Sequence, residues 1–281
     1  MTEVIINLKL EMSELLKKNA PIGVLDSGVG GLSVLKCLKT MLPHEDFIYL
    51  GDTARTPYGP RSEAEVRQFV GEMLNYFETQ GAKLVVIACN TLTVLGVDTL
   101  KGNHEYDIIG MSKGANLVLN ASRNKTIGVF ATEFTINSGA HKAAILAVDS
   151  TATVVPKACP KFVPMIEGER FDSPEIKAAI AEYALPLKAA GVDTMILSCT
   201  HYPFIKKEIE DEMGAGVKVI DPAEQTALDT KAALEDGGLL QTAGYGNTTI
   251  CFTADLERGK RIAARMFDVE ACTFQNVTLG K

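Results

Sequence analysis

Two of the six cysteines stand in matching contexts, each at the end of a short apolar run. Each is followed at once by side chains that can hold or pass a proton. The two motifs are Cys89-Asn90-Thr91 and Ser198-Cys199-Thr200-His201. We expect a helix N-terminus after each motif, which would lower the pKa of its thiol, and His201 could serve the neighbouring thiol as a base or proton partner. A single buried cysteine is usually a packing residue, so it is the pair that favours acid–base chemistry.

A glycine-rich turn follows the first apolar run of the core. Gly28 and Gly30 begin a dinucleotide fingerprint, but Ser33 stands where its third glycine is required, which disfavours a nicotinamide site. The favoured interpretation is a turn whose backbone amides approach a small anion, with Asp26 and Ser27 pointing into a cleft. The alternative is a strand-to-helix turn that uses glycine only for its conformational freedom.

A second polar loop, residues 51–59, follows the next apolar run. Its turn-forming residues indicate a loop at the same rim as the glycine-rich turn. Tyr58 could offer a hydroxyl there and Gly59 a backbone amide. Further along, Glu167 is either a surface acid or a carboxylate paired with His201, and the sequence leaves both open.

Other common chemistries lack their motifs. The chain has no G-x-S-x-G elbow and no G-x-x-x-x-G-K-[ST] loop, which disfavours a serine hydrolase and a nucleotide-phosphate enzyme. Its cysteines are dispersed, without a CxxC pair or Cys/His zinc spacing, so neither a disulfide framework nor a metal site is expected. Cys37, Cys251 and Cys272 are interpreted as packing residues.

Composition narrows the class of protein further. The chain has 281 residues, 46% hydrophobic and 22% charged, with a formal net charge of −7. The acidic balance disfavours a nucleic-acid-binding protein, and an acidic ligand would need local capture by backbone amides. No run approaches the ~18 apolar residues of a membrane helix, and Glu3, Glu11 and Glu14 argue against a signal peptide. We therefore expect a cytoplasmic protein without a membrane or nucleic-acid partner.

Apolar runs alternate with helical sequence through most of the chain. This alternation predicts an α/β fold with parallel sheets that are covered on both faces. Helices are expected at residues 3–18, 32–41 and 63–80. Strands are expected at residues 22–25, 47–50, 84–88, 108–109, 126–130, 192–197 and 217–220.

Two pairs of segments repeat in the same order. Residues 22–25 are echoed by residues 127–130, and residues 84–91 by residues 194–201. Chance likeness among buried strands is one explanation, since short apolar runs carry little information. The other is a pair of similar α/β lobes, each presenting a cysteine at the carboxyl end of a strand, where open α/β sheets bind ligands. Two facing lobes would place the two thiols on opposite sides of one cleft.

Taken together, these motifs resemble the cofactor-independent aspartate/glutamate racemase superfamily. The resemblance rests on the paired cysteine motifs, on the stretch DSGVGGLSV at residues 26–34, on the loop at 49–59 and on TEFTI at 132–136. It runs from about residue 21 to about residue 253. It implies a bacterial isomerase that interconverts L- and D-glutamate and supplies D-glutamate for peptidoglycan synthesis, and DSGVGGLSV favours glutamate over aspartate as the substrate.

The resemblance also implies a mechanism and roles for individual residues. Cys89 would deprotonate the D isomer at Cα with help from Asp26. Cys199 would deprotonate the L isomer with help from His201 and Glu167. No cofactor and no metal is implied. The implied substrate-binding residues are Asp26, Ser27, Pro57, Tyr58, Gly59, Cys89, Asn90, Thr91, Thr132, Thr135, Cys199, Thr200 and His201.

The predicted architecture is two similar parallel-sheet α/β lobes with the active site in the cleft between them. Residues 1–20 would form an N-terminal helical extension, residues 21–117 plus 222–281 the first lobe, and residues 118–221 the second. A homodimer is expected. Three alternatives stay open: an aspartate racemase or other two-cysteine racemase, a catalytically silent binding or inhibitory protein of this fold, and a thiol redox protein, although the CxxC pair of that class is missing.

Overall fold

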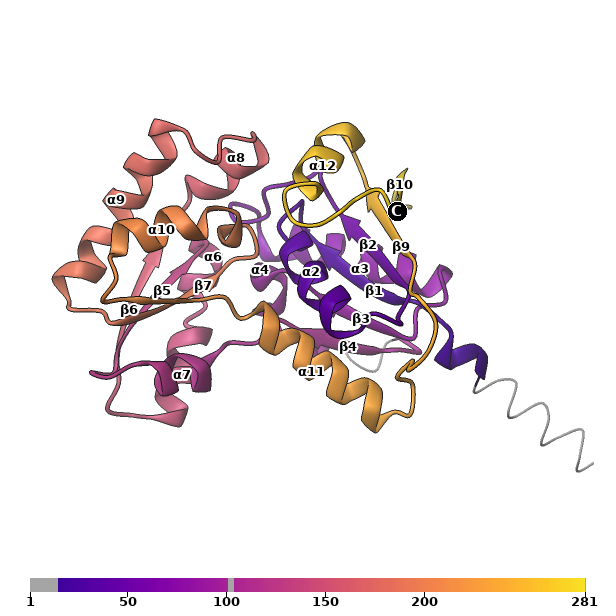
Figure 1. Ribbon diagram of the computed structural model, residues 1–281, viewed down its shortest axis with the longest axis horizontal. Helices are drawn as coiled ribbons and strands as arrows, with labels where there is room; N and C mark the ends of the chain where they lie inside the picture. The colour runs from indigo at the N-terminus through magenta and orange to yellow at the C-terminus, as the bar shows by residue number, and fades with distance from the viewer. Residues whose placement is uncertain (1–14, 101–103, 281) are drawn as a thin grey trace, which may run out of the picture.

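The computed structural model describes residues 15–100 and 104–280. They form two sheets in which neighbouring strands run parallel. The first sheet has six strands in the order β10-β9-β2-β1-β3-β4, and the second has four in the order β6-β5-β7-β8. Figure 1 shows the sheets side by side, each with its own helices, and we call these assemblies the first and second lobe. The predicted α/β class with two parallel sheets is confirmed.

The elements follow the chain in alternation. The strands of the first lobe are β1 (Ile22–Asp26), β2 (Phe47–Gly51), β3 (Leu84–Ile87), β4 (Asp107–Gly110), β9 (Thr248–Phe252) and β10 (Cys272–Asn276). Those of the second lobe are β5 (Thr126–Ala131), β6 (Thr153–Ala158), β7 (Thr194–Ser198) and β8 (Lys218–Ile220). The helices are α2 (Leu32–Met41), α3 (Glu63–Thr79), α4 (Asn90–Thr93), α5 (Ala115–Ala121), α6 (Glu133–Asn137), α7 (Ala140–Val148), α8 (Phe162–Glu167), α9 (Pro174–Ala189), α10 (Lys206–Met213), α11 (Ala223–Asp236) and α12 (Leu256–Ala263), with short 3₁₀ helices η1 (Val97–Thr99) and η2 (Tyr202–Ile205).

Strand β1 shows why its sheet is covered on both faces. Ile22 and Val24 pack in one hydrophobic cluster with residues of α2 and α11, whereas Leu25 packs in a second cluster with residues of α3. Successive side chains of a strand point to opposite faces, so a run of apolar residues without polar alternation serves two helical layers at once.

The internal repeat predicted from the sequence has a structural counterpart. Strands β2-β1-β3-β4 of the first sheet and β6-β5-β7-β8 of the second follow the same order relative to the chain. Gly23 on β1 and Gly128 on β5 also match. A Cβ at either glycine would lie 2.6 Å from a side chain, that of Phe77 on α3 or Leu187 on α9. Each glycine therefore lets a helix pack close to its sheet.

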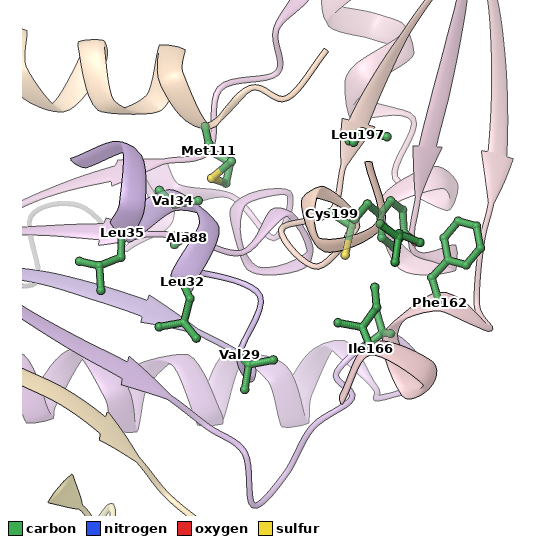
Figure 2. Packing of buried hydrophobic residues seen from close by; sticks show 14 of the residues in the cluster. Val29, Leu32, Val34, Leu35, Ala88, Met111, Phe162, Ile166, Leu197 and Cys199 are labelled. Atoms are coloured by element: carbon green, nitrogen blue, oxygen red, sulfur yellow. The ribbon is translucent and has the colours of Figure 1, made fainter. Parts of the chain in front are cut away.

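The lobes share a continuous apolar junction. Val29, in the turn after β1, and Ile166, on α8, belong to the same buried cluster as Cys199. Figure 2 shows Val29 and Leu32 facing Ile166 and Phe162 across this junction. In the sequence, four strands of the first sheet precede the second lobe and two follow it. The lobe boundaries at 117/118 and 221/222 stay a prediction.

The helix predicted at residues 3–18 falls mostly outside the described residues. Within them, residues 15–18 are helical. No helix in the described part of the chain is both long and apolar enough to cross a membrane.

Candidate active site

A cavity of about 160 Å³ lies where the carboxyl ends of strands from both sheets meet. Most of the residues implied for substrate binding line it. These are Ser27, Pro57, Tyr58, Gly59, Cys89, Asn90, Thr91, Thr132, Cys199, Thr200 and His201. Asp26 and Thr135, also implied, are buried but do not line the cavity.

Cys89 enters the cavity from the first lobe. It is the N-cap residue of the short helix α4, directly after β3, and it is only 5% exposed. Its Sγ lies 3.6 Å from the hydroxyl of Ser27. Burial, followed by the negative charge of Asp26, raises the pKa of Cys89 to about 12. The expectation that the helix N-terminus would lower this pKa is wrong, because desolvation of the thiolate outweighs the effect of so short a helix.

Cys199 enters the same cavity from the second lobe, directly after β7. Its Sγ lies 3.9 Å from Nδ1 of His201. The other ring nitrogen of His201, Nε2, lies 2.8 Å from Oε1 of Glu167. Of the two interpretations left open for Glu167, the buried partner of His201 is the one observed. The helix expected after this motif is the 3₁₀ helix η2, and His201 is its N-cap residue.

The electrostatics of this trio favour an imidazolium. Burial opposes a charge on His201, but the sulfur of Cys199 and the carboxylate of Glu167 outweigh it and raise the pKa of His201 well above its ordinary value. Burial likewise opposes a charge on Glu167, yet His201, the amide of Val29 and the charge of Arg258 lower the pKa of Glu167. An imidazolium beside a sulfur stabilises the thiolate form of that sulfur.

Asp26 connects the lobes beneath the cavity. Its Oδ2 accepts a 3.0 Å hydrogen bond from the hydroxyl of Thr200 in the opposite lobe, and its Oδ1 accepts a 2.8 Å bond from the amide of Gly28. Ser33 makes a second cross-lobe bond, because its hydroxyl donates to the backbone oxygen of Thr200 at 3.0 Å. Asp26 acts on Cys89 through its charge, and burial raises the pKa of Asp26 itself.

The glycine-rich turn captures carboxylates of the protein itself. The amide of Gly28 donates to Asp26, and the amide of Val29 donates to Oε1 of Glu167 at 3.1 Å. The expectation that the amides of this turn approach a free anion is therefore wrong for these two donors. The glycines serve close approach: a Cβ on Gly28 would lie 2.1 Å from Oε1 of Glu167, and a Cβ on Gly30 would lie 2.4 Å from Nδ1 of His201.

The loop at residues 51–59 lines the cavity differently from the sequence expectation. The hydroxyl of Tyr58 donates a short hydrogen bond to Asp52, so it is not available to donate to a substrate. Asp52 is also paired with Arg55, whose Nε lies 2.5 Å from it. These bonds fix the loop, and Pro57 and Gly59 of the same loop also line the cavity.

Hydroxyls from both lobes meet at another side of the cavity. The Oγ1 atoms of Thr91 and Thr132 lie 3.0 Å apart, and those of Thr132 and Thr135 lie 3.1 Å apart. Thr132 is the N-cap residue of α6 and accepts from the amide of Thr135. Thr135 thus contacts the cavity only through Thr132.

Several lining residues were not predicted from the sequence. They are Pro60, Glu133, Cys159, Pro160, Val163 and Pro164. The last four follow β6, the strand whose internal Pro156 weakens its sequence signal. Glu133 directly follows Thr132 at the end of β5, and that position is the signal that would have found it. Within the described residues, no group of three or more His, Cys, Asp or Glu could hold a metal ion.

Asn90 offers the cavity an unused donor. The residue is 3% exposed, and its Nδ2 has no hydrogen-bond partner among the described residues. A buried donor of this kind matches an anionic ligand group. We expect Asn90→Ala to weaken substrate binding by about 1.5–3 kcal/mol, the usual contribution of a hydrogen bond to a charged group, and so to raise KM roughly tenfold or more. Steady-state kinetics check this, with Asn137→Ala outside the cavity as the control, and an unchanged KM would contradict it.

Comparisons with known proteins identify the family to which the chain belongs. Residues 22–229 match the family model described as Asp/Glu/Hydantoin racemase. A glutamate racemase of Lysinibacillus sphaericus is 43% identical over 226 residues, which cover 80% of this chain and 85% of that protein. The crystal structure of a glutamate racemase isoform from Bacillus anthracis superposes with a TM-score of 0.87 at 33% identity, covering 93% of this chain and 98% of that one. The glutamate racemase of Francisella tularensis, solved in complex with D-glutamate, gives a TM-score of 0.84 at 33% identity, with the same coverage.

These similarities show that the protein is a racemase and therefore an isomerase. The chain belongs to the Asp/Glu/Hydantoin racemase family.

Proposed function

We propose that this enzyme interconverts L- and D-glutamate by removing the Cα proton with one cysteine and returning a proton with the other. The observation that carries the proposal is the pair of buried thiols, Cys89 and Cys199, which enter one small cavity from opposite lobes. Inverting a stereocentre through proton transfer needs a base on one face and an acid on the other. A single rigid group serves both faces poorly, whereas a thiolate and a thiol that face each other serve both.

The surroundings of the two thiols support different resting protonation states. Cys89 is held as a thiol by its raised pKa. Cys199 lies beside His201, whose raised pKa favours an imidazolium. In this form Cys199 removes the proton of L-glutamate and Cys89 delivers its own proton to the opposite face. The protonation states are then reversed, and D-glutamate returns them by the same steps.

The remaining groups have supporting roles in this proposal. Asn90, Thr91, Thr132 and Thr200 present amide and hydroxyl groups to the ammonium and carboxylates of the substrate. These groups are held in place by the protein, so their dipoles act on the developing carbanion with little reorganisation. Ser27 holds Cys89 through its hydroxyl.

Glutamate is the proposed substrate because the relatives compared above are glutamate racemases at 33–43% identity. The test is the assay of purified protein with L- and D-glutamate and with L- and D-aspartate, without added cofactor. Racemisation of glutamate at a kcat/KM well above that for aspartate is the expected result. Preference for aspartate would favour the alternative racemase, and no turnover of either would favour a binding or inhibitory protein.

The cellular role follows from the reaction. D-glutamate is a component of peptidoglycan, and we propose that the enzyme supplies it for cell-wall synthesis. A homodimer and a cytoplasmic location stay predictions.

The pH dependence of kcat/KM should be bell-shaped. On the acid side the rate falls as Glu167, whose pKa is lowered, takes up a proton and no longer supports the charge of His201. On the alkaline side it falls as the acid thiol ionises. Burial and then Asp26 raise the pKa of Cys89 to about 12, so we expect this limb well above neutrality. The two apparent values belong to the coupled groups together.

Initial rates from mildly acid to strongly alkaline pH check this profile. Free L- and D-glutamate have equal free energies, so kcat/KM must be the same in both directions and the two profiles must coincide. A rate that stays flat to the alkaline extreme would argue against a thiol acid.

A further inference from the structure

A row of arginines on the first lobe faces a row of acids on the second. Figure 1 shows α12 of the first lobe opposite α8 of the second. Each arginine of the row approaches one carboxylate across the junction. The pairs are Arg258 Nη2 with Glu167 Oε2 at 3.7 Å, Arg261 Nη2 with Glu169 Oε1 at 2.5 Å, and Arg265 Nη2 with Asp172 Oδ2 at 3.7 Å.

Arg258 differs from the other two because its partner belongs to the active site. Oε1 of Glu167 already accepts from His201 and from the amide of Val29. Oε2 is buried and has no hydrogen-bond partner among the described residues. Oε2 instead forms an ion pair with the guanidinium of Arg258. Nη1 of the same guanidinium donates to the backbone oxygen of Glu167 at 3.4 Å.

The position of Arg258 is fixed by the packing of α12 against the first sheet. Its neighbour Gly259 lies so close to β9 that a Cβ there would be 2.2 Å from the ring of Phe252. Phe252 packs edge-on against Tyr49, with ring centroids 5.9 Å apart. The hydroxyl of Tyr49 in turn donates to the backbone oxygen of Gly28 at 2.8 Å. The helix that carries Arg258 is therefore held against the turn that touches Glu167.

We infer that Arg258 is a positioning residue for the racemisation, which holds Glu167 ionised and oriented so that His201 stays beside Cys199. The inference rests on the proposed function. Arg258 acts through Glu167 and His201 and does not line the cavity. Its side chain is 22% exposed and that of Glu167 is 7% exposed, so the pair is only partly screened by water.

The charges around Glu167 define what the loss of Arg258 would do. From the second lobe His201 faces Glu167, and from the first lobe Arg258, Asp26 and Tyr49 do. Asp26 opposes a negative charge there, Tyr49 stays neutral because its own pKa is raised well above its ordinary value, and His201 and Arg258 support the charge. Without Arg258, the carboxylate keeps His201 and the Val29 amide but loses one of its two supporting positive charges, so the pKa of Glu167 should rise.

The test compares Arg258→Gln with Arg258→Lys and Arg261→Gln in the full-length enzyme. Arg258→Gln should lower kcat for glutamate about tenfold or more through misplacement of His201, with little change in KM. The acid limb of its kcat/KM profile should move to higher pH by about 0.5–1 unit. Arg258→Lys keeps the charge and should bring the limb most of the way back. Arg261→Gln removes a cross-lobe pair of the same helix without touching Glu167, so its acid limb should match that of the wild type.

Each outcome decides between explanations. An unshifted acid limb in Arg258→Gln would overturn the inference, and so would equal losses in Arg258→Gln and Arg261→Gln, which would indicate that α12 matters only as a bridge. If Arg258→Gln is poorly folded, Arg258→Met, which also lacks the charge, takes its place, and the same shift of the acid limb is expected while an unshifted limb would overturn the inference. A wild-type enzyme that does not racemise glutamate would refute the proposed function instead.

Discussion

Replacing either Cys89 or Cys199 by serine is expected to lower kcat/KM for both L- and D-glutamate at least ~100-fold. Every turnover uses both thiols, one to remove a proton and the other to deliver one. A serine hydroxyl is about the size of a thiol but ionises at a far higher pH, so it is a poor base near neutrality. Because both cysteines are buried at 5% exposure and serine is no larger, we expect the variants to fold.

Racemisation is followed by circular dichroism of the substrate, starting from L-glutamate and from D-glutamate. Thermal unfolding of each variant shows whether it is folded. Cys37→Ser is the matched control, because Cys37 is a half-buried thiol on α2 outside the cavity. It should keep wild-type racemisation. Full activity in a folded Cys89→Ser or Cys199→Ser variant would return that cysteine to a packing role.

Gly30→Ala is expected to lower kcat/KM by about 100-fold although the substituted residue carries no chemistry. The new Cβ would lie 2.4 Å from Nδ1 of His201 and 2.6 Å from the hydroxyl of Thr200. Both side chains are held by other hydrogen bonds, His201 through Nε2 to Glu167 and Thr200 through its hydroxyl to Asp26. The clash must therefore move His201 away from Cys199 or push the lobes apart, and a shift of about 1 Å in a catalytic group can cost about 100-fold in rate.

Gly71→Ala is the control for this substitution. Gly71 lies within α3, and a Cβ there would meet no atom within 4 Å. Alanine is the better helix former, so this variant should be as stable as the wild type or more so, with unchanged kinetics. Wild-type activity in Gly30→Ala would contradict the close approach of the two lobes at this turn.

The parts of the fold with a strong local signal could be predicted from the sequence. Helix α2 has the predicted bounds, and strands such as β1 and β3 are apolar runs that end at polar motifs. Three strands were missed, which are β6, β9 and β10. Strand β9 is central in its sheet, and its apolar run is short because it begins with two threonines. Strand β6 contains Pro156 and is tolerated because it lies at the edge of its sheet. Strand β10 lies at the edge of the other sheet, and much of it is exposed.

The candidate site divides in the same way. Residues in compact motifs, such as Cys89 and His201, could be found from sequence because type and spacing suggest chemistry. The pairing of Glu167 with His201, 34 positions apart in the sequence, depends on how the lobes pack. Burial also has no local signal, and it is burial that raises the pKa of Cys89 where the helix N-terminus alone would lower it. Arg258 lies on a helix near the C-terminus, and nothing in its own neighbourhood points to the active site.

The central claim is that Cys89 and Cys199 act on opposite faces of one substrate. It is tested most directly with the single-thiol variants and a glutamate analogue that carries chloride on Cβ. Removal of the Cα proton by the remaining thiolate expels chloride and leaves an enamine, which water converts to a 2-oxo acid and ammonia, so no second acid is needed. Chloride release is then measured with the L and D forms of the analogue, up to strongly alkaline pH because the pKa of Cys89 is raised to about 12.

We predict that Cys199→Ser, which keeps Cys89, releases chloride from the D analogue alone, and that Cys89→Ser, which keeps Cys199, releases it from the L analogue alone. The wild-type enzyme should process both. Release from both analogues by either single-thiol variant would show that one cysteine reaches both faces, and that result would contradict the two-thiol mechanism.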